Sequence, residues 1–123
     1  MKKEVLSLLK PYECKSLLDM TFGAGGHSRA FLEGSPDSSV LALDRDPLAY
    51  RLAQELEDEM KGKVTALNGR FSELPQLLGK VKVRPGSLDA VLMDLGVSSM
   101  QLDTGQRGFS ISLDGPLDMR MDC

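Results

Sequence analysis

Residues 17–27 read Leu-Leu-Asp-Met-Thr-Phe-Gly-Ala-Gly-Gly-His, and this stretch decides the fold. A short apolar run from Ser16 to Leu18 ends in the acid Asp19, three glycines follow within four positions, and a helix-like pattern comes next. Glycine adopts positive φ and lets a ligand approach the backbone, so strand, glycine turn and helix together predict a nucleotide-type cofactor loop. The spacing is Gly-x-Gly-Gly, which does not meet the Gly-x-Gly-x-x-Gly dinucleotide fingerprint, and a tight structural turn remains the alternative.

The composition is that of a single soluble globular domain. The chain has 123 residues, of which 41% are hydrophobic and 27% charged, and both fractions are ordinary. Its net charge of -3 argues against a strongly basic nucleic-acid clamp, so any RNA contact must be local. No apolar run approaches the roughly 20 residues of a membrane span, so we expect no membrane contact. Two cysteines and one histidine supply neither a disulfide framework nor a zinc site, so we expect reduced intracellular thiols and no metal.

Apolar runs and helical spacing alternate along the first 95 residues. Strands are predicted over residues 15–20, 40–44, 64–67 and 88–95, and helices over residues 2–9, 27–33, 47–60 and 72–78. This alternation predicts β-α-β units with right-handed crossovers and a parallel sheet, which is an α/β fold. Asp46 is expected to cap the helix that begins at Pro47, and Ser72 to cap the next one.

Acids follow three of the predicted strands, at Asp19, Asp44 and Asp94. Ligands of parallel sheets bind beyond the carboxyl ends of the strands, so we expect these carboxylates to lie together around a ligand. Asp44 lies about twenty residues beyond the glycines, the spacing at which an acid accepts hydrogen bonds from ribose hydroxyls. A helix-capping or turn role is the alternative for this residue, because aspartate is common before helices.

The sequence changes character after the fourth predicted strand. Residues 96–103 show no clear helical start, and residues 107–110 and 114–122 add two further loop-like motifs. Loops beyond strand ends carry function more often than the elements themselves. Residues 114–122 alternate apolar and charged side chains, which predicts an extended segment with one buried face. Arg120 lies between two acids in this segment, and a surface ion pair and a ligand clamp are equally compatible with that position.

Five motifs in this order resemble the RsmH (MraW) family of S-adenosylmethionine-dependent methyltransferases, which act on N4 of a cytidine in small-subunit ribosomal RNA. They are Asp-Met-Thr-Phe-Gly-Ala-Gly-Gly-His-Ser (19–28), Leu-Asp-Arg-Asp-Pro (43–47), Met-Asp-Leu-Gly-Val-Ser-Ser-x-Gln-Leu-Asp (93–103), Arg-Gly-Phe-Ser (107–110) and Asp-Gly-Pro-Leu-Asp-Met-Arg-Met-Asp (114–122). Met20 and Met100 stand where bacterial members usually have Gly and Pro, and look more like the mitochondrial branch of vertebrates. The resemblance therefore implies the mitochondrial matrix, with the cytoplasm as the alternative.

The resemblance also implies an architecture. Members of the family have a Rossmann-like class I methyltransferase sheet, whose first four parallel strands lie in the order 3-2-1-4 with flanking helices. They are more than twice as long as this chain, so residues 1–123 are expected to form the amino-terminal part of the cofactor-binding core. The substrate-recognition domain and the remaining strands would then be absent. The strand at 88–95 would become an uncovered apolar edge, and such an edge invites pairing, so we expect a homodimer or poor solubility.

Residue by residue, the motifs imply a site for S-adenosylmethionine. The cofactor-binding positions would be Gly25, Gly26 and His27 for the methionine end, Asp44 for the ribose, Phe71 for the adenine, and Asp94 with Gln101 to complete the site. His27 opens a helix, whose first backbone N–H groups can hold a carboxylate. The alternatives are a polar helix-start residue for His27 and an ordinary core aromatic for Phe71.

Asp94 is also the candidate catalytic residue. The amine of cytosine delocalises its lone pair into the ring, so an acceptor near the amine hydrogens would help it to attack. We expect Asp94 to be that acceptor, with Ser98 nearby.

Two other functions compete with this interpretation. One is a catalytically inactive cofactor-binding or interaction module of the same family. The other is a nicotinamide-dependent oxidoreductase, which the glycine spacing and the motif at 114–122 both disfavour.

Overall fold

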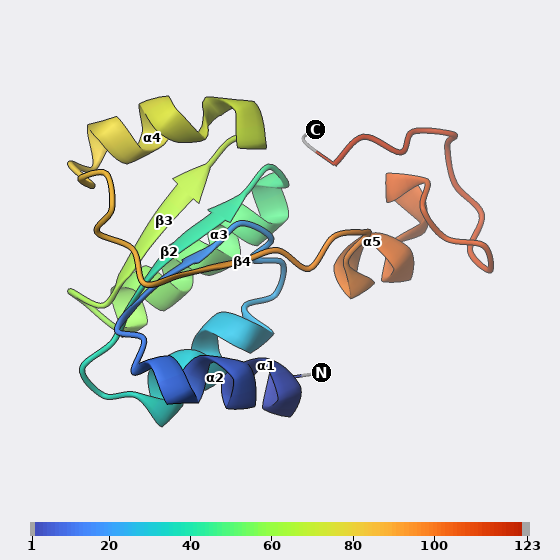
Figure 1. The fold of residues 1–123 in the computed structure, drawn as a ribbon. Coiled ribbons are helices and arrows are strands. Elements are labelled where there is room, and N and C mark those ends of the chain that lie inside the picture. Colours follow the sequence, from blue (N-terminus) through green and yellow to red (C-terminus); the bar gives the residue numbers. More distant parts are fainter. Residues whose placement is uncertain (1, 122–123) are drawn as a thin grey trace.

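A computed structural model of the chain describes residues 2–121. These residues form a four-stranded sheet, and helices cover both of its faces (Figure 1). The strands are β1 (Ser16–Asp19), β2 (Ser39–Asp44), β3 (Val64–Asn68) and β4 (Ala90–Leu92). The α-helices are α1 (Lys2–Leu9), α2 (Gly26–Gly34), α3 (Pro47–Glu59), α4 (Leu74–Lys80) and α5 (Ser99–Asp103). Short 3-10 turns are η1 (Lys10–Tyr12), η2 (Phe71–Glu73) and η3 (Gly105–Arg107).

The sheet has the predicted order, β3-β2-β1-β4, and its neighbouring strands pair in parallel. Asp19 is aligned with Ala42 of β2, and Asp44 with Asn68 of β3. The carboxyl ends of the strands therefore meet at one edge, which confirms the predicted Rossmann-like arrangement.

Two apolar layers cover the faces of the sheet. On one face α1, α2 and α3 pack over a core that includes Leu17, Phe31, Val40 and Leu56. On the other face α4 covers a smaller cluster, with Leu18, Leu43 and Leu67 at its centre. Strands enclosed on both sides read as continuous apolar runs, which is why β1 and β2 were recognisable from sequence.

Helices α1, α2 and α3 lie close to their predicted bounds, and Asp46 caps α3 as expected, accepting a hydrogen bond from the N–H of Leu48 at 2.9 Å. Ser72 is not a cap. It lies inside η2, and the turn starts instead with the Glu73 carboxylate accepting from the N–H of Arg70 at 2.9 Å.

The fourth strand is much shorter than the predicted range of 88–95. Its partner β1 ends at Asp19 and then turns away, so the ladder has no further neighbour. The N–H of Asp94 donates instead to the hydroxyl of Thr21 at 2.7 Å. A strand predicted from hydrophobicity alone extends beyond the point where its neighbour stops.

The prediction of an extended segment with one buried face over 114–122 is wrong for the residues described, and Asp122 lies outside them. Leu117 is fully exposed and Met119 is 62% exposed. No strand lies in residues 93–121, so the alternation finds no sheet to pack against. Arg120 forms an exposed ion pair with Asp118 at 2.6 Å, and this pairing lowers the pKa of Asp118 to about 2.

Between residues 2 and 121, no helix has both the length and the apolar content that crossing a membrane requires. In the same range, no three histidine, cysteine or acidic side chains gather in a way that could hold a metal ion.

Asp89 joins the start of β4 to the start of β1. One oxygen of its carboxylate accepts hydrogen bonds from the backbone N–H groups of Lys15 and Ser16, both at 2.9 Å, and from the Ser16 hydroxyl at 3.1 Å. The Lys15 and Ser16 backbone donors favour the ionised form and hold the pKa of Asp89 below its ordinary 3.8. The ionised carboxylate therefore stabilises the fold above this ordinary value, and the contribution is lost as the pH falls through the lowered pKa.

We predict that Asp89→Asn lowers the free energy of unfolding at pH 7, because an amide is a weaker acceptor than a carboxylate. The same variant loses less stability than the wild type when the pH falls from about 5 to 2, since this titration is gone. Urea denaturation across that range measures both effects. Asp37→Asn, at an exposed position in the turn before β2, is the matched control, and equal pH profiles for Asp89→Asn and the wild type would contradict the prediction.

Candidate functional site

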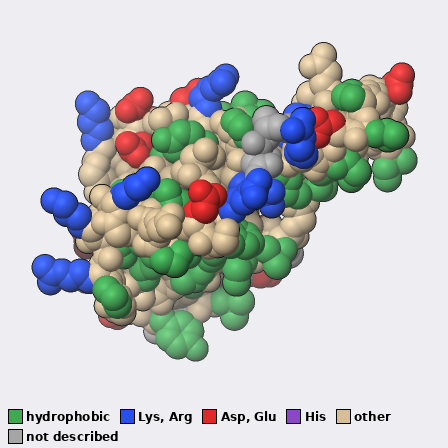
Figure 2. Space-filling view, turned by 90° about the horizontal axis from the view of Figure 1, so that it is seen from above, with side chains coloured by type: hydrophobic (Ala, Val, Ile, Leu, Met, Phe, Trp, Pro, Cys, Tyr) green, Lys and Arg blue, Asp and Glu red, His purple; other side chains and the backbone are tan. Residues whose placement is uncertain are grey.

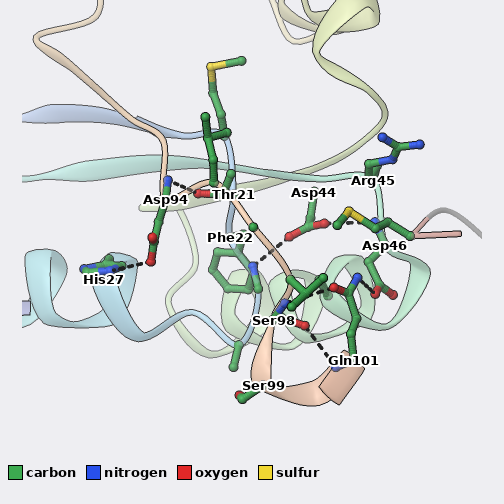
Figure 3. Close-up of a pocket in the computed structure, with 18 of the residues that line it drawn as sticks. Thr21, Phe22, His27, Asp44, Arg45, Asp46, Asp94, Ser98, Ser99 and Gln101 are labelled. Carbon is green, nitrogen blue, oxygen red and sulfur yellow. Dashed lines mark hydrogen bonds and ion pairs between the residues drawn. The ribbon is translucent and has the colours of Figure 1, made fainter. Parts of the chain in front are cut away.

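A cavity of 620 Å³ opens at the carboxyl edge of the sheet, where Figure 3 shows the side chains gathered. The glycine loop after β1, the end of β2, the start of α3, η2 and the chain after β4 all contribute to it. The predicted site residues that line it are Gly26, His27, Asp44, Phe71, Asp94 and Gln101. The sheet thus brings residues far apart in sequence to one place.

Gly25 does not line the cavity, and its role is in the turn. Its φ is +85°, and a Cβ built on it would lie 2.6 Å from Cζ of Phe22, whose ring is buried. Gly23 also has positive φ, at +57°. The loop can therefore turn tightly over the Phe22 ring only where side chains are absent.

Of the three acids, Asp19 faces the interior rather than the cavity. It is 1% exposed, and its oxygens accept hydrogen bonds from the Ser28 hydroxyl at 2.6 Å and from the N–H of Thr21 at 3.1 Å. Burial raises the pKa of Asp19, with the Ser28 and Thr21 hydrogen bonds opposing it. Asp19 therefore holds the start of the glycine loop to α2, and two of the three acids, Asp44 and Asp94, line the cavity.

Asp44 presents its carboxylate to the cavity in a fixed orientation. Oδ2 accepts from the N–H of Gly23 at 2.8 Å, and Oδ1 from the N–H of Asp46 at 2.9 Å. Each carboxylate oxygen has two lone-pair sites, so both can accept a further hydrogen bond. The turn role that the sequence left open for Asp44 is present, and it orients the same carboxylate that lines the cavity.

Asp94 and His27 meet at the opposite side of the cavity (Figure 3). The Asp94 side chain is half exposed, and its Oδ2 lies 3.4 Å from Nε2 of His27. Nδ1 of His27 is buried without a hydrogen-bond partner among the described residues. The accessible polar group at this side of the cavity is therefore the Asp94 carboxylate, with His27 beside it.

Phe71 is 46% exposed at the start of η2, so it is not an ordinary core aromatic. It lines the cavity together with Arg70 and Ser72. An exposed aromatic face beside a polar cavity is suited to contact a flat ring.

The chain after β4 begins a helix that the sequence analysis did not predict. Ser98 caps α5, accepting from the N–H of Gln101 at 3.2 Å, while the Gln101 amide oxygen accepts from the N–H of Ser98 at 3.0 Å. This reciprocal pair is a capping box, and the Ser-x-x-Gln spacing of residues 98–101 marks it in the sequence. Gln101 is 3% exposed, and its Nε2 donates to Asp46 at 2.7 Å.

Asp46 and Arg107 form a buried ion pair that sequence reasoning also missed. Asp46 is 2% exposed, and the two Arg107 Nη atoms lie 3.1 and 2.8 Å from its two oxygens. Burial alone would raise the pKa of Asp46, but hydrogen bonds from Arg107 and Gln101 outweigh it and hold the pKa below its ordinary value. The two residues are 61 positions apart, and no local pattern links them.

Residues 1–123 match the MraW methylase family. The chain belongs to this family. It is 54% identical over 122 residues to the Bos taurus 12S rRNA N(4)-cytidine methyltransferase METTL15, and the alignment covers 99% of this chain and 30% of that protein. It is 49% identical to the ribosomal RNA small subunit methyltransferase H of Parvibaculum lavamentivorans, covering 98% of this chain and 35% of that protein. The chain thus spans about a third of the length of these relatives.

A solved structure supports the fold independently of sequence. A putative caffeoyl-CoA O-methyltransferase from Staphylococcus aureus superposes with a TM-score of 0.54 at 16% identity, covering 62% of this chain and 38% of that chain. This likeness agrees with the Rossmann-like sheet described above.

We predict that Gly25→Ala destabilises the protein by about 1–3 kcal/mol, because it combines a strained φ with a clash against the Phe22 ring. Gly34→Ala is the control: α2 ends at this residue and a Cβ there meets nothing within 4 Å. We expect its free energy of unfolding to change by less than about 1 kcal/mol. Thermal or urea unfolding of both variants measures the difference, and equal stabilities would show that the loop tolerates a side chain.

Proposed function

We propose that this chain is the amino-terminal, S-adenosylmethionine-binding part of an enzyme that methylates N4 of a cytidine in small-subunit ribosomal RNA. The observation that carries the proposal is that Asp44 and Asp94 open into one cavity beside the glycine loop. Membership of the MraW methylase family and the names of the relatives support the same reaction.

The cavity has groups suited to each part of S-adenosylmethionine. Asp44 can accept hydrogen bonds from the ribose hydroxyls, and the exposed Phe71 ring can contact the adenine. Gly26 and His27 open α2, where free backbone N–H groups and the helix dipole favour a carboxylate. Gln101 lines the same cavity, although its amide already bonds Ser98 and Asp46. Its part would be to shape the wall by packing.

The cofactor would supply a sulfonium methyl group as the electrophile. The protein would hold the reacting groups in position and supply the electrostatic environment. Asp94 would accept a hydrogen bond from the exocyclic amine of cytosine, which would raise the electron density on the amine nitrogen as it attacks. Thr21 fixes the Asp94 backbone, and His27 lies beside its carboxylate. Asp94 would then also receive the proton that the amine loses after methyl transfer.

Titration calorimetry with S-adenosylmethionine tests the cofactor, with NAD as the comparison. We expect saturable binding of S-adenosylmethionine and none of NAD, and the reverse result would favour an oxidoreductase.

A methylation assay on small-subunit RNA then tests the reaction. Asp94→Ala should lower the rate by about 10²–10⁴-fold, the usual range for a lost acid–base group. Undiminished turnover would remove Asp94 from the mechanism, and binding without turnover would indicate an inactive module.

The name of the Bos taurus relative includes the 12S ribosomal RNA, which is the small-subunit RNA of mitochondria. We therefore place the proposed reaction in the mitochondrial matrix. Tagged protein that stays outside mitochondria on fractionation would move it to the cytoplasm.

We also propose that β4 pairs with a second copy of this chain. Within residues 2–121 β4 is an edge strand of the sheet, and Val91 and Met93 are 53% and 54% exposed. Figure 2 looks onto the side that carries α4 and shows hydrophobic side chains exposed there. An uncovered strand with apolar side chains is a template for pairing.

Light scattering should show a dimer or aggregation that increases with concentration, and Val91→Lys should reduce it, because edge lysines oppose pairing. Lys61, on the exposed turn after α3, offers a control in Lys61→Gln. A wild-type chain that stays monomeric at high concentration would rule the dimer out.

A further inference from the structure

We propose that Arg107 is a positioning residue for the cavity: by binding the buried Asp46 it holds residues 96–121 in place as one wall of the cofactor site. We name the Asp46–Arg107 pair the clasp. The inference rests on the proposed function where it concerns the cofactor, whereas the clasp itself is a property of the chain.

Residues 96–121 contribute a wall to the cavity without being part of the sheet. Figure 1 shows this segment leaving β4 and extending beyond the body of the molecule. The members of the segment that line the cavity are Gly96, Val97, Ser98, Ser99, Gln101 and Met121. The wall therefore depends on contacts made by side chains, because no strand pairing holds it.

Few side chains of the segment are buried. Gln101 and Phe109 are 3% and 8% exposed, whereas Ile111, Leu117 and Met119 are largely in solvent. Apolar burial is the main stabilising term in most folds, and here it is small. Polar contacts with the core consequently matter more in this segment than elsewhere.

The polar contacts converge on one carboxylate. Asp46 receives both Nη atoms of Arg107, at 2.8 and 3.1 Å, and Nε2 of Gln101 at 2.7 Å. A bidentate guanidinium–carboxylate pair is among the strongest and most directional polar contacts. Removing the guanidinium would leave a buried carboxylate with its best partner missing, which is costly.

Arg107 also reaches the far end of the segment. Its Nη2 donates to the carbonyl oxygens of Arg120 and Met121, at 3.3 and 3.2 Å. Met121 is the cavity-lining residue at this end of the segment. The Arg107 guanidinium thus connects Asp46, at the start of α3, to the far end of the wall, and Gln101 connects the near end to the same carboxylate.

Close backbone packing makes the middle of the segment a single unit. A Cβ on Gly105 would lie 2.5 Å from the carbonyl oxygen of Asp114, and a Cβ on Gly108 would lie 2.5 Å from those of Pro116 and Asp118. The backbone around residues 105–108 therefore contacts the backbone of residues 114–118 at glycines, where no side chain intervenes. Fixing Arg107 therefore fixes the orientation of the unit, and releasing it frees the whole wall.

Thermodynamic linkage gives this inference a second consequence. If the clasp raises the affinity for the cofactor by some factor, then bound cofactor must favour the arrangement in which the clasp is formed by the same factor. Coupling of this kind ordinarily amounts to about 5–150-fold. The segment should therefore become better protected when S-adenosylmethionine is added to the wild type.

The test compares Arg107→Met with Arg107→Lys and with the wild type. Met removes the charge, and Lys keeps the charge but cannot bind bidentately. We expect Arg107→Met to raise the dissociation constant for S-adenosylmethionine about tenfold or more. It should raise hydrogen exchange in residues 96–121 by a similar factor, with β1, β2 and β3 still protected. Both the dissociation constant and the hydrogen exchange of Arg107→Lys should lie between those of Arg107→Met and the wild type.

Arg29→Gln is the matched control, because it removes an exposed arginine that pairs with Glu59 at 2.7 Å, away from the segment. It should change neither readout. An unchanged dissociation constant and unchanged exchange in Arg107→Met would overturn the proposal. So would loss of protection throughout the sheet, which would make Arg107 a residue that supports the fold alone. If the wild type binds no S-adenosylmethionine, the cofactor proposal fails, and exchange in residues 96–121 then decides for or against the clasp.

Discussion

The hydrogen bond from the N–H of Gly23 to Oδ2 of Asp44 joins the loop after β1 to the tip of β2, and the cavity depends on it. Beside it, the N–H of Phe22 donates to the carbonyl oxygen of Leu43 at 3.1 Å. Together these contacts continue the pairing of β1 and β2 past the end of the strands. The glycine loop is thereby held beside a carboxylate, and α2 begins at a fixed place relative to it.

Three aspartates at corresponding places, the carboxyl ends of three strands, receive three different environments. Asp19 is enclosed and bonded to Ser28, so burial raises its pKa. Asp44 is half buried between backbone donors, and Asp94 is half exposed beside His27. One sequence pattern therefore produces an interior support, a fixed acceptor and an accessible acceptor. Asp19 is the enclosed one of the three because its strand, β1, lies between β2 and β4.

The parallel sheet and the place of the cavity were predictable because they follow from short-range signals repeated along the chain, whereas the strand order was implied by the family resemblance. Apolar runs that end in an acid mark strands enclosed on both faces, and parallel strands bring those ends to one edge. The end of β4 and the exposure of Leu117 were not predictable in this way. Both depend on what lies next to a segment in space: β1 stops at Asp19, and no strand reaches residues 114–121.

Asp46 illustrates the part of the site that local patterns miss. Its position before Pro47 identifies it as a helix cap, and the structure confirms that it caps α3. A capping aspartate needs only one oxygen for the helix and is normally solvated, yet Asp46 is buried and its other oxygen binds Gln101. The burial is tolerable because Arg107 supplies the opposite charge from 61 positions away. A residue with a sufficient local role can thus carry a second, distant one, and burial of its charge is the structural sign of it.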